Sequence, residues 1–252
     1  MNEDYPSFLT PESKSFDPIK LTLKTKEIVS KGNLRKYTDF YCVGVYGGIS
    51  TGYTVGCSLR CIFCWVNWSR DFPHKAGKLF TPEQVFYSLT NNARRKGIKK
   101  LRISGGEPTL SDEHLISVLE LISKTDFLFI LETNGLLLGK DPELVNNLKQ
   151  YKNIHIRVSL KAGTPEGFEK RTGGIGEFSE LPFQAIKYLK REGISFHVAA
   201  MTDSRLMPRD ERLEMLHKLE QIGYQDFLEE EHCDFYSSSV KRLEKAGFKL
   251  WK

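Results

Sequence analysis

Short apolar segments alternate with amphipathic segments along most of the chain, and this alternation limits the fold more than any other feature. Leu115, Val118, Leu119 and Ile122 form an apolar stripe at helical spacing, and the strongly apolar run 127–132 follows them. Apolar strands separated by helices are typical of a buried parallel sheet, whose strand-to-helix loops share one rim. The predicted strands are 51–55, 100–104, 127–132, 154–160, 194–201 and 226–229.

The segments between the strands begin and end as helices do. Asp17 precedes Pro18 and Thr81 precedes Pro82, which is typical of an N-cap followed by proline at the first helical position. Asp112 is predicted to cap the next helix. The predicted helices are 18–31, 82–96, 112–122, 142–148, 180–191, 209–222 and 237–245. About six strand–helix units indicate an α/β fold, a partial (β/α)6 barrel rather than a complete eight-unit one.

Three cysteines lie within eight residues, directly after the first predicted strand. Cys57, Cys61 and Cys64 have C-x3-C-x2-C spacing. Thiolates are soft ligands that suit zinc or iron–sulfur clusters, and structural zinc usually takes four ligands from two C-x2-C pairs. The sequence has one such pair and one further thiol nearby. Three thiols on a four-iron cluster would leave one iron open to a small molecule. A zinc site completed by a remote Cys or His, or three unlinked thiols, are the alternatives.

Polar and glycine-rich motifs end the next three predicted strands. Ser104-Gly-Gly-Glu-Pro108 contains paired glycines, which let the backbone approach a ligand closely. Glu132-Thr-Asn-Gly135 and Ser159-Leu-Lys161 end the following two strands. In a parallel sheet these motifs lie at the same rim as the cysteine loop, so we expect one binding site there.

The cysteine spacing followed by the Gly-Gly-Glu-Pro motif resembles the radical S-adenosylmethionine (SAM) superfamily. The resemblance runs from about residue 47 to residue 231. It implies that Cys57, Cys61 and Cys64 hold a [4Fe–4S] cluster whose open iron binds SAM. It further implies reductive cleavage of SAM to methionine and a 5′-deoxyadenosyl radical, which removes a hydrogen atom from a substrate.

The resemblance also assigns residues to SAM. Phe63 would pack on the adenine, and the backbone or carboxylate around Glu107 would accept from the amino group. The complete set of expected SAM contacts is Phe63, Gly105, Gly106, Glu107, Thr133, Asn134, Ser159, Lys161 and His197. His232, which follows the last predicted strand, is expected on the substrate side. The run Glu229 to Glu231 is expected to be a solvated charge run.

Within the superfamily, the motifs are most similar to the glycyl-radical-enzyme activating-enzyme-like branch. That branch has Asp-Thr-Asn-Gly and Asp-Leu-Lys segments at the ends of the corresponding strands. Glu132 and Ser159 replace the two aspartates, which puts that branch's monovalent cation site in doubt. His197 stands near an arginine of that branch.

The partners and the substrate are less constrained. The resemblance implies an electron donor such as flavodoxin or ferredoxin and, by similarity to activating enzymes, a protein substrate. Residues 1–100 hold 16 Lys or Arg against 8 Asp or Glu, so a tRNA or other RNA substrate is the alternative. A metal-stabilised binding module is the alternative that is not an enzyme. Cys42 and Cys233 are expected to be buried, inert thiols.

Composition is typical of a soluble globular protein. Hydrophobic residues make up 40% of the 252 and charged residues 27%. Five cysteines, three of them clustered, do not suit a secreted disulfide scaffold, and a reducing cytoplasm fits best. With no apolar run near 18 residues and no signal peptide in the sequence, we expect no membrane span. Residues 1–40 are interpreted as an N-terminal extension and 41–252 as the barrel.

Overall fold

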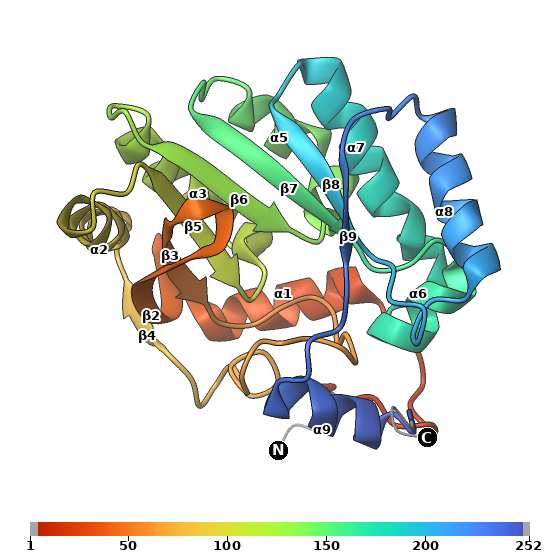
Figure 1. The fold of residues 1–252 in the computed structure, drawn as a ribbon. Coiled ribbons are helices and arrows are strands. Elements are labelled where there is room, and N and C mark those ends of the chain that lie inside the picture. The colour runs from red at the N-terminus through yellow and green to blue at the C-terminus, as the bar shows by residue number, and fades with distance from the viewer. Residues whose placement is uncertain (1–4, 249–252) are drawn as a thin grey trace.

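The computed structural model describes residues 5–248, which contain a single mixed sheet with helices packed against it (Figure 1). The strands are β1 (Ser30–Lys31), β2 (Leu34–Val43), β3 (Ile49–Thr54), β4 (Lys78–Phe80), β5 (Lys100–Gly105), β6 (Leu128–Thr133), β7 (Ile154–Leu160), β8 (Phe196–Met201) and β9 (Leu228–Glu231). Their order in the sheet is β1-β2-β3-β5-β6-β7-β8-β9, and β4 pairs with β2. β1 and β9 are the two ends of this strand order, so the sheet does not close into a full barrel.

Six strands run parallel, and these are the six that the sequence predicts. β3 pairs in parallel with β5, and the parallel pairing continues through β6, β7 and β8 to β9. The α/β fold with a partial six-unit barrel is therefore confirmed. Because these strands are parallel, the loops that follow them gather at one rim.

The helices are α1 (Pro18–Val29), α2 (Pro82–Arg95), α3 (Asp112–Ile122), α4 (Leu136–Lys140), α5 (Pro142–Leu148), α6 (Pro165–Thr172), α7 (Leu181–Glu192), α8 (Arg209–Gln221) and α9 (Ser237–Lys245). Asp17 caps α1 by accepting from the backbone N–H of Ile19 at 2.8 Å. Thr81 and Gln84 form a capping box at the start of α2. One predicted cap is wrong, because Ser111 precedes α3 and Asp112 is its first residue.

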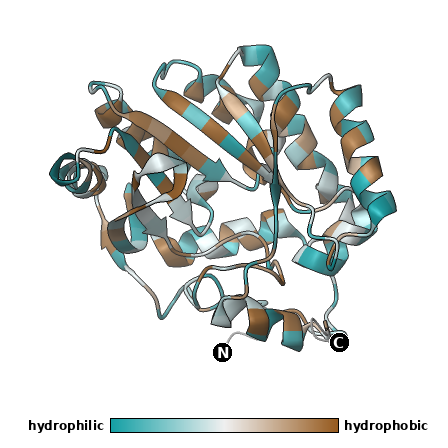
Figure 2. Cartoon of the chain, in the orientation of Figure 1, coloured by the Kyte–Doolittle hydropathy of each residue, from teal (hydrophilic) through white to brown (hydrophobic). Residues whose placement is uncertain are grey.

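The main core lies between the sheet and its outer helices. It combines Leu101, Leu131 and Val158 from the strands with apolar residues of α2, α3, α5, α7 and α8. Successive residues of a strand point to opposite faces, so Arg157 and Ser159 lie on the other, inner face. Figure 2 shows brown and teal residues alternating along β7, as this arrangement requires. The inner face is therefore polar.

The hairpin that begins the sheet was missed by the sequence interpretation. β2 pairs antiparallel with β3, and the predicted boundary at residue 40 falls inside β2. Charged residues at Arg35, Lys36 and Asp39 hide the strand pattern, although Arg35 is only 1% exposed. The segment from Leu34 onward thus belongs to the sheet. The short helices α4 and α6 and the 3-10 turn η3 (Gly176–Glu180) were also not predicted.

A second, smaller core surrounds the cysteine loop. It brings together Leu59 and Ile62 of that loop, Phe168 of α6 and Leu243 of α9. In Figure 1, α9 (blue) lies beside the orange loop that follows β3, although the two are far apart in the chain. No helix within residues 5–248 has the length and apolar character needed to cross a membrane.

Candidate active site

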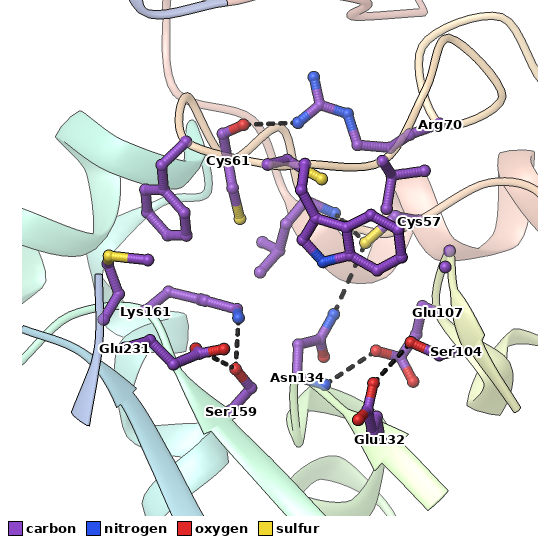
Figure 3. Close-up of a pocket in the computed structure, with 18 of the residues that line it drawn as sticks. Cys57, Cys61, Arg70, Ser104, Glu107, Glu132, Asn134, Ser159, Lys161 and Glu231 are labelled. Carbon is purple, nitrogen blue, oxygen red and sulfur yellow. Dashed lines mark hydrogen bonds between the residues drawn. The ribbon is translucent and has the colours of Figure 1, made fainter. Parts of the chain in front are cut away.

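One pocket at the carboxyl ends of the parallel strands contains almost every predicted site residue. It offers about 920 Å³ of space free of protein atoms, its open mouth included. The predicted residues that line it are Cys57, Cys61, Phe63, Cys64, Gly105, Gly106, Glu107, Thr133, Asn134, Ser159, Lys161 and His232. Figure 3 shows the cysteine loop on one side of this pocket and the strand ends on the other.

The three cysteines of the loop are free thiols that face this pocket. Burial raises the pKa of the Cys61 thiol to about 12 and also raises the pKa of Cys57. A metal that binds here must therefore displace protons that the thiols would otherwise keep. No group of three His, Cys, Asp or Glu side chains in the described part of the chain is arranged to hold a single metal ion. Three soft thiol donors that line one pocket are a donor set that fits an iron–sulfur cluster.

The backbone around Gly105 and Gly106 packs directly on the strand that leads to the cysteine loop. Gly106 N–H donates to the carbonyl of Thr54 at 2.9 Å, and Glu107 N–H donates to that of Gly56 at 2.8 Å. A Cβ on Gly106 would lie 2.1 Å from the Gly56 oxygen. Gly105 has φ +90°, a conformation that favours glycine. Both glycines are therefore needed to join the two loops.

The Glu107 carboxylate ties the end of β5 to the end of β6. Its Oε1 accepts from the Thr109 hydroxyl at 2.7 Å and the Thr133 hydroxyl at 2.8 Å, and it also accepts from Thr109 N–H. Its Oε2 accepts from Asn134 N–H at 2.9 Å. A carboxylate has about four acceptor positions, so Oε2 is the atom with room for a ligand donor.

Asn134 connects the strand ends to the cysteine loop. Its Nδ2 donates to the Ser58 hydroxyl at 3.1 Å and lies 3.8 Å from the Cys57 sulfur (Figure 3). Its Oδ1 accepts from Leu136 N–H at 3.0 Å, which starts α4. The short side chain thus fixes the turn after β6 and reaches the loop at the same time.

Lys161 and Ser159 form a hydrogen-bonded group with Glu231, from the end of β9. Lys161 Nζ donates to the Ser159 hydroxyl at 2.5 Å, and that hydroxyl donates to Glu231 at 3.1 Å (Figure 3). Lys161 Nζ also lies 5.8 Å from the Phe63 ring centroid. Burial opposes ionisation of Glu231, but Lys161 and Arg157 outweigh burial and lower its pKa.

The inner face of the sheet carries ion pairs of two buried arginines that the sequence interpretation missed. Arg157 donates to Glu229 at 2.8 Å and to Glu231 at 2.7 Å. Glu132 accepts from Arg102 at 2.8 Å and from Ser104 at 2.5 Å. Glu229 and Glu231 are therefore not a solvated charge run, and alternation along β7 and β9 is the signal that could have placed them inward. The pocket-lining residues that were not predicted include Trp65, Glu132, Arg157, Met201, Glu231 and Asp234.

His197 is the one predicted residue that the structure places elsewhere. It is not among the residues that line the pocket. Its ring lies 3.0 Å from a Glu229 oxygen and 2.7 Å from the ring of His155. His197 lies near the start of β8, whereas Met201 at the end of that strand reaches the pocket. Because His197 lies near the opposite end of β8 from Met201, its side chain does not line the pocket, and the expected contact with SAM is not supported.

Comparison with known proteins identifies the family. A model described as the radical SAM superfamily matches residues 52–219. The chain is 31% identical over 144 residues to a probable GTP 3′,8-cyclase of Thermococcus kodakarensis, covering 54% of this chain and 42% of the relative. It is 30% identical over 136 residues to a GTP 3′,8-cyclase of Clostridium perfringens, covering 53% and 40%. The chain thus spans less than half the length of these curated relatives.

The fold resembles a solved structure as well. The crystal structure of Streptococcus suis SuiB bound to S-adenosylmethionine matches with a TM-score of 0.58 and 17% identity, covering 74% of this chain and 40% of SuiB. At that identity, the likeness shows the fold alone. The prediction of the superfamily is confirmed. The predicted branch is not shown, because the relatives are named as cyclases and not as activating enzymes.

Proposed function

This chain belongs to the radical SAM superfamily, and from that premise we propose that it is an enzyme that cleaves S-adenosylmethionine reductively and removes a hydrogen atom from a substrate. Cys57, Cys61 and Cys64 would hold a [4Fe–4S] cluster. When bound, the cluster supplies the electron that breaks the sulfonium bond of SAM. The observation that carries the proposal is that three thiols and the ends of five strands line one pocket.

The polypeptide would bind and orient SAM. The Glu107 Oε2 atom and nearby backbone carbonyls can accept from the amino group of SAM. Lys161, which is held by Ser159, can donate to its carboxylate or ribose. Phe63 is 6% exposed and lines the pocket, so it offers an apolar surface to the adenine.

The substrate would lie on the other side of the pocket, against Glu132, Arg157, Glu231 and His232. The two arginines that line the pocket are each paired with carboxylates, Arg70 with Asp71 and Arg157 with Glu229 and Glu231. A triphosphate needs cations that are free to bind it, and the remaining lysine of the pocket lining, Lys161, is assigned to SAM in this proposal. We therefore do not propose GTP as the substrate of this chain, although the names of the relatives imply it.

We propose instead a polar substrate without a strong negative charge, such as a group on a protein. The activating-enzyme-like role is one form of this proposal, with a large partner at the open rim. A tRNA or other RNA is the alternative, supported by the basic residues 1–100. Salt-sensitive tRNA binding favours RNA, and retention of a protein partner on a column favours protein. A flavodoxin or ferredoxin is the proposed electron donor.

Anaerobic reconstitution with iron and sulfide tests the proposal. We expect a brown protein with about four irons per chain, which releases 5′-deoxyadenosine when dithionite and SAM are added. Cys64→Ala should lose both properties. Cys42→Ala is the matched control, because Cys42 lies in β2 and is not among the pocket-lining residues. A colourless protein that retains zinc would instead indicate a metal-stabilised binding module.

A further inference from the structure

Three buried arginines contact the backbone of the cysteine loop, one at each cysteine. Arg60 Nη1 donates to the carbonyl of Cys57 at 2.8 Å. Arg70 Nη1 donates to the carbonyl of Cys61 at 2.6 Å, as Figure 3 shows. Arg242 Nη1 donates to the carbonyl of Cys64 at 2.5 Å. We call Arg60, Arg70 and Arg242 the loop arginines.

Arg60 lies within the cysteine loop and Arg70 shortly after it, whereas Arg242 comes from a distant part of the chain, and further contacts fix Arg60 and Arg242. Arg242 belongs to α9 and also donates to the carbonyls of Val66 at 2.6 Å and Asn67 at 3.0 Å. Arg60 also donates to the carbonyls of Leu59, at 2.8 Å, and Pro6, and its guanidinium lies 4.9 Å from the Tyr5 ring centroid. The loop is therefore held both by an arginine of its own and by α9.

The charges of the loop arginines are only partly balanced. Their exposed fractions are 1% for Arg60, 2% for Arg70 and 2% for Arg242. Asp71 is 0% exposed and pairs with both Arg70 and Arg242, and it is the one carboxylate in the described residues that forms an ion pair with any of the three. Three positive charges against one negative leave an excess of positive charge in the interior.

Buried charge without a partner is costly, so this excess needs a negative group nearby. Protonated thiols do not provide one. Three thiolates that hold an iron–sulfur cluster carry net negative charge, and reduction adds one more negative charge. Two buried guanidinium nitrogens, Arg60 Nη2 and Arg242 Nε, also have no hydrogen-bond partner. The surroundings of the loop are therefore suited to an anionic group.

We propose that the loop arginines are positioning residues that hold the three ligand carbonyls and stabilise the reduced form of the cluster. This inference rests on the proposed function, because it assumes that the three cysteines hold a cluster. Positive charge near an iron–sulfur cluster favours its reduced state and so raises its reduction potential. Removing a loop arginine lowers the potential, and removing the charge of Asp71 raises it.

The test is a redox titration of the reconstituted full chain without SAM, followed by electron paramagnetic resonance. Arg60→Gln is expected to shift the midpoint to a more negative potential, and Arg60→Lys to leave it near the wild-type value. Asp71→Asn, which keeps the shape of the side chain, is expected to shift it in the positive direction. Arg191→Gln is the matched control, since Arg191 is exposed on α7 and should cause no shift.

If the loop arginines act through their charge, Arg60→Gln and Asp71→Asn shift the midpoint potential in opposite directions. Simple loosening of the loop would shift both midpoint potentials in the same direction. Unchanged potentials, shifts of the same sign, or failure of both variants to bind iron at the wild-type level would overturn the proposal. If the wild-type chain itself binds no iron, the proposed function fails instead. Failure of this inference can thus be distinguished from failure of the proposed function.

Discussion

At the residue scale, Gly106 shows how closely the two loops of the site approach each other. A Cβ at this position would lie 2.1 Å from the Gly56 carbonyl oxygen and 3.0 Å from that of Thr54. Both neighbours are backbone atoms, which cannot move away as a side chain can. We therefore expect Gly106→Ala to lower the free energy of unfolding by about 3 kcal/mol and to weaken SAM binding. Urea unfolding and equilibrium SAM binding measure the two effects.

The control for this prediction is Gly44→Ala. A Cβ on Gly44 has no atom within 4 Å, and its φ of −78° suits alanine. This variant should unfold within about 0.5 kcal/mol of the wild type or be slightly more stable. If Gly106→Ala and Gly44→Ala lost equal amounts of stability, the close approach of the backbone at Gly106 would not explain the loss.

The sequence predicted well which residues meet at the rim pocket, because these residues belong to short local motifs. Cys57, Cys61 and Cys64 share one loop, and Glu107 and Asn134 each end a strand. His197 was expected at the pocket and does not line it, because the sequence does not show how far along β8 its side chain lies. The contacts of Arg242 could not be predicted, since its partner Cys64 is 178 residues away in the sequence.

At the element scale, α3 contacts β2 through a histidine that is held neutral. His114 Nδ1 lies 2.8 Å from the Asn33 carbonyl, and its Nε2 lies 3.1 Å from the Tyr37 hydroxyl. An N–H at Nδ1 donates to the carbonyl, and the bare Nε2 accepts from the hydroxyl. Burial lowers the pKa of His114 to about 4 from its ordinary value of 6.5. The folded protein therefore resists protonation at this site.

The consequence is a dependence of stability on pH. Between pH 6.5 and pH 4 the unfolded chain binds a proton at His114 that the folded chain does not bind. The free energy of unfolding should therefore fall as the pH is lowered through this window, by up to about 3 kcal/mol from this residue. Urea unfolding of the wild type and His114→Gln between pH 7 and pH 4 isolates the contribution.

His217→Gln is the control for the pH experiment, because the His217 side chain is 59% exposed on α8. It should keep the wild-type dependence on pH, whereas His114→Gln should lose part of it. Parallel curves for the wild type and His114→Gln would show that the packing of α3 on β2 does not exclude the proton.

Five of the six parallel strands, β3 and β5 to β8, are mostly buried, and the apolar runs among them made the sheet predictable, whereas β9 is only partly buried. β2 could not be predicted, since its buried residue Arg35 looks like a surface charge. Its guanidinium donates to the carbonyl of Val55 at 2.7 Å, which only the folded structure reveals. The same reason explains the inward-facing Arg157 and Glu229.

At the scale of the whole molecule, the cysteine loop is part of a core that joins distant segments. Leu9, Phe168 and Leu243 all pack into the same cluster of apolar residues as Cys61. An iron–sulfur cluster that binds to the folded chain and not to the unfolded chain stabilises every segment of this core. Reconstitution should therefore raise the urea midpoint of unfolding and leave the slope of the transition unchanged.

The apo and reconstituted forms of the wild type should be compared with Cys64→Ala treated in the same way. The variant should show no rise in the midpoint, because a ligand is missing. A rise of equal size in Cys64→Ala would mean that iron or sulfide stabilises the chain without the predicted site.

The contact between Arg242 and the Cys64 carbonyl also bears on the order of events during protein synthesis. A ribosome makes the cysteines early and residue 242 almost two hundred residues later. Until that arginine has emerged, the third cysteine lacks one of the contacts that hold it. The finished loop therefore forms only after α9 has been made, and we expect insertion of the metal centre to follow translation of α9.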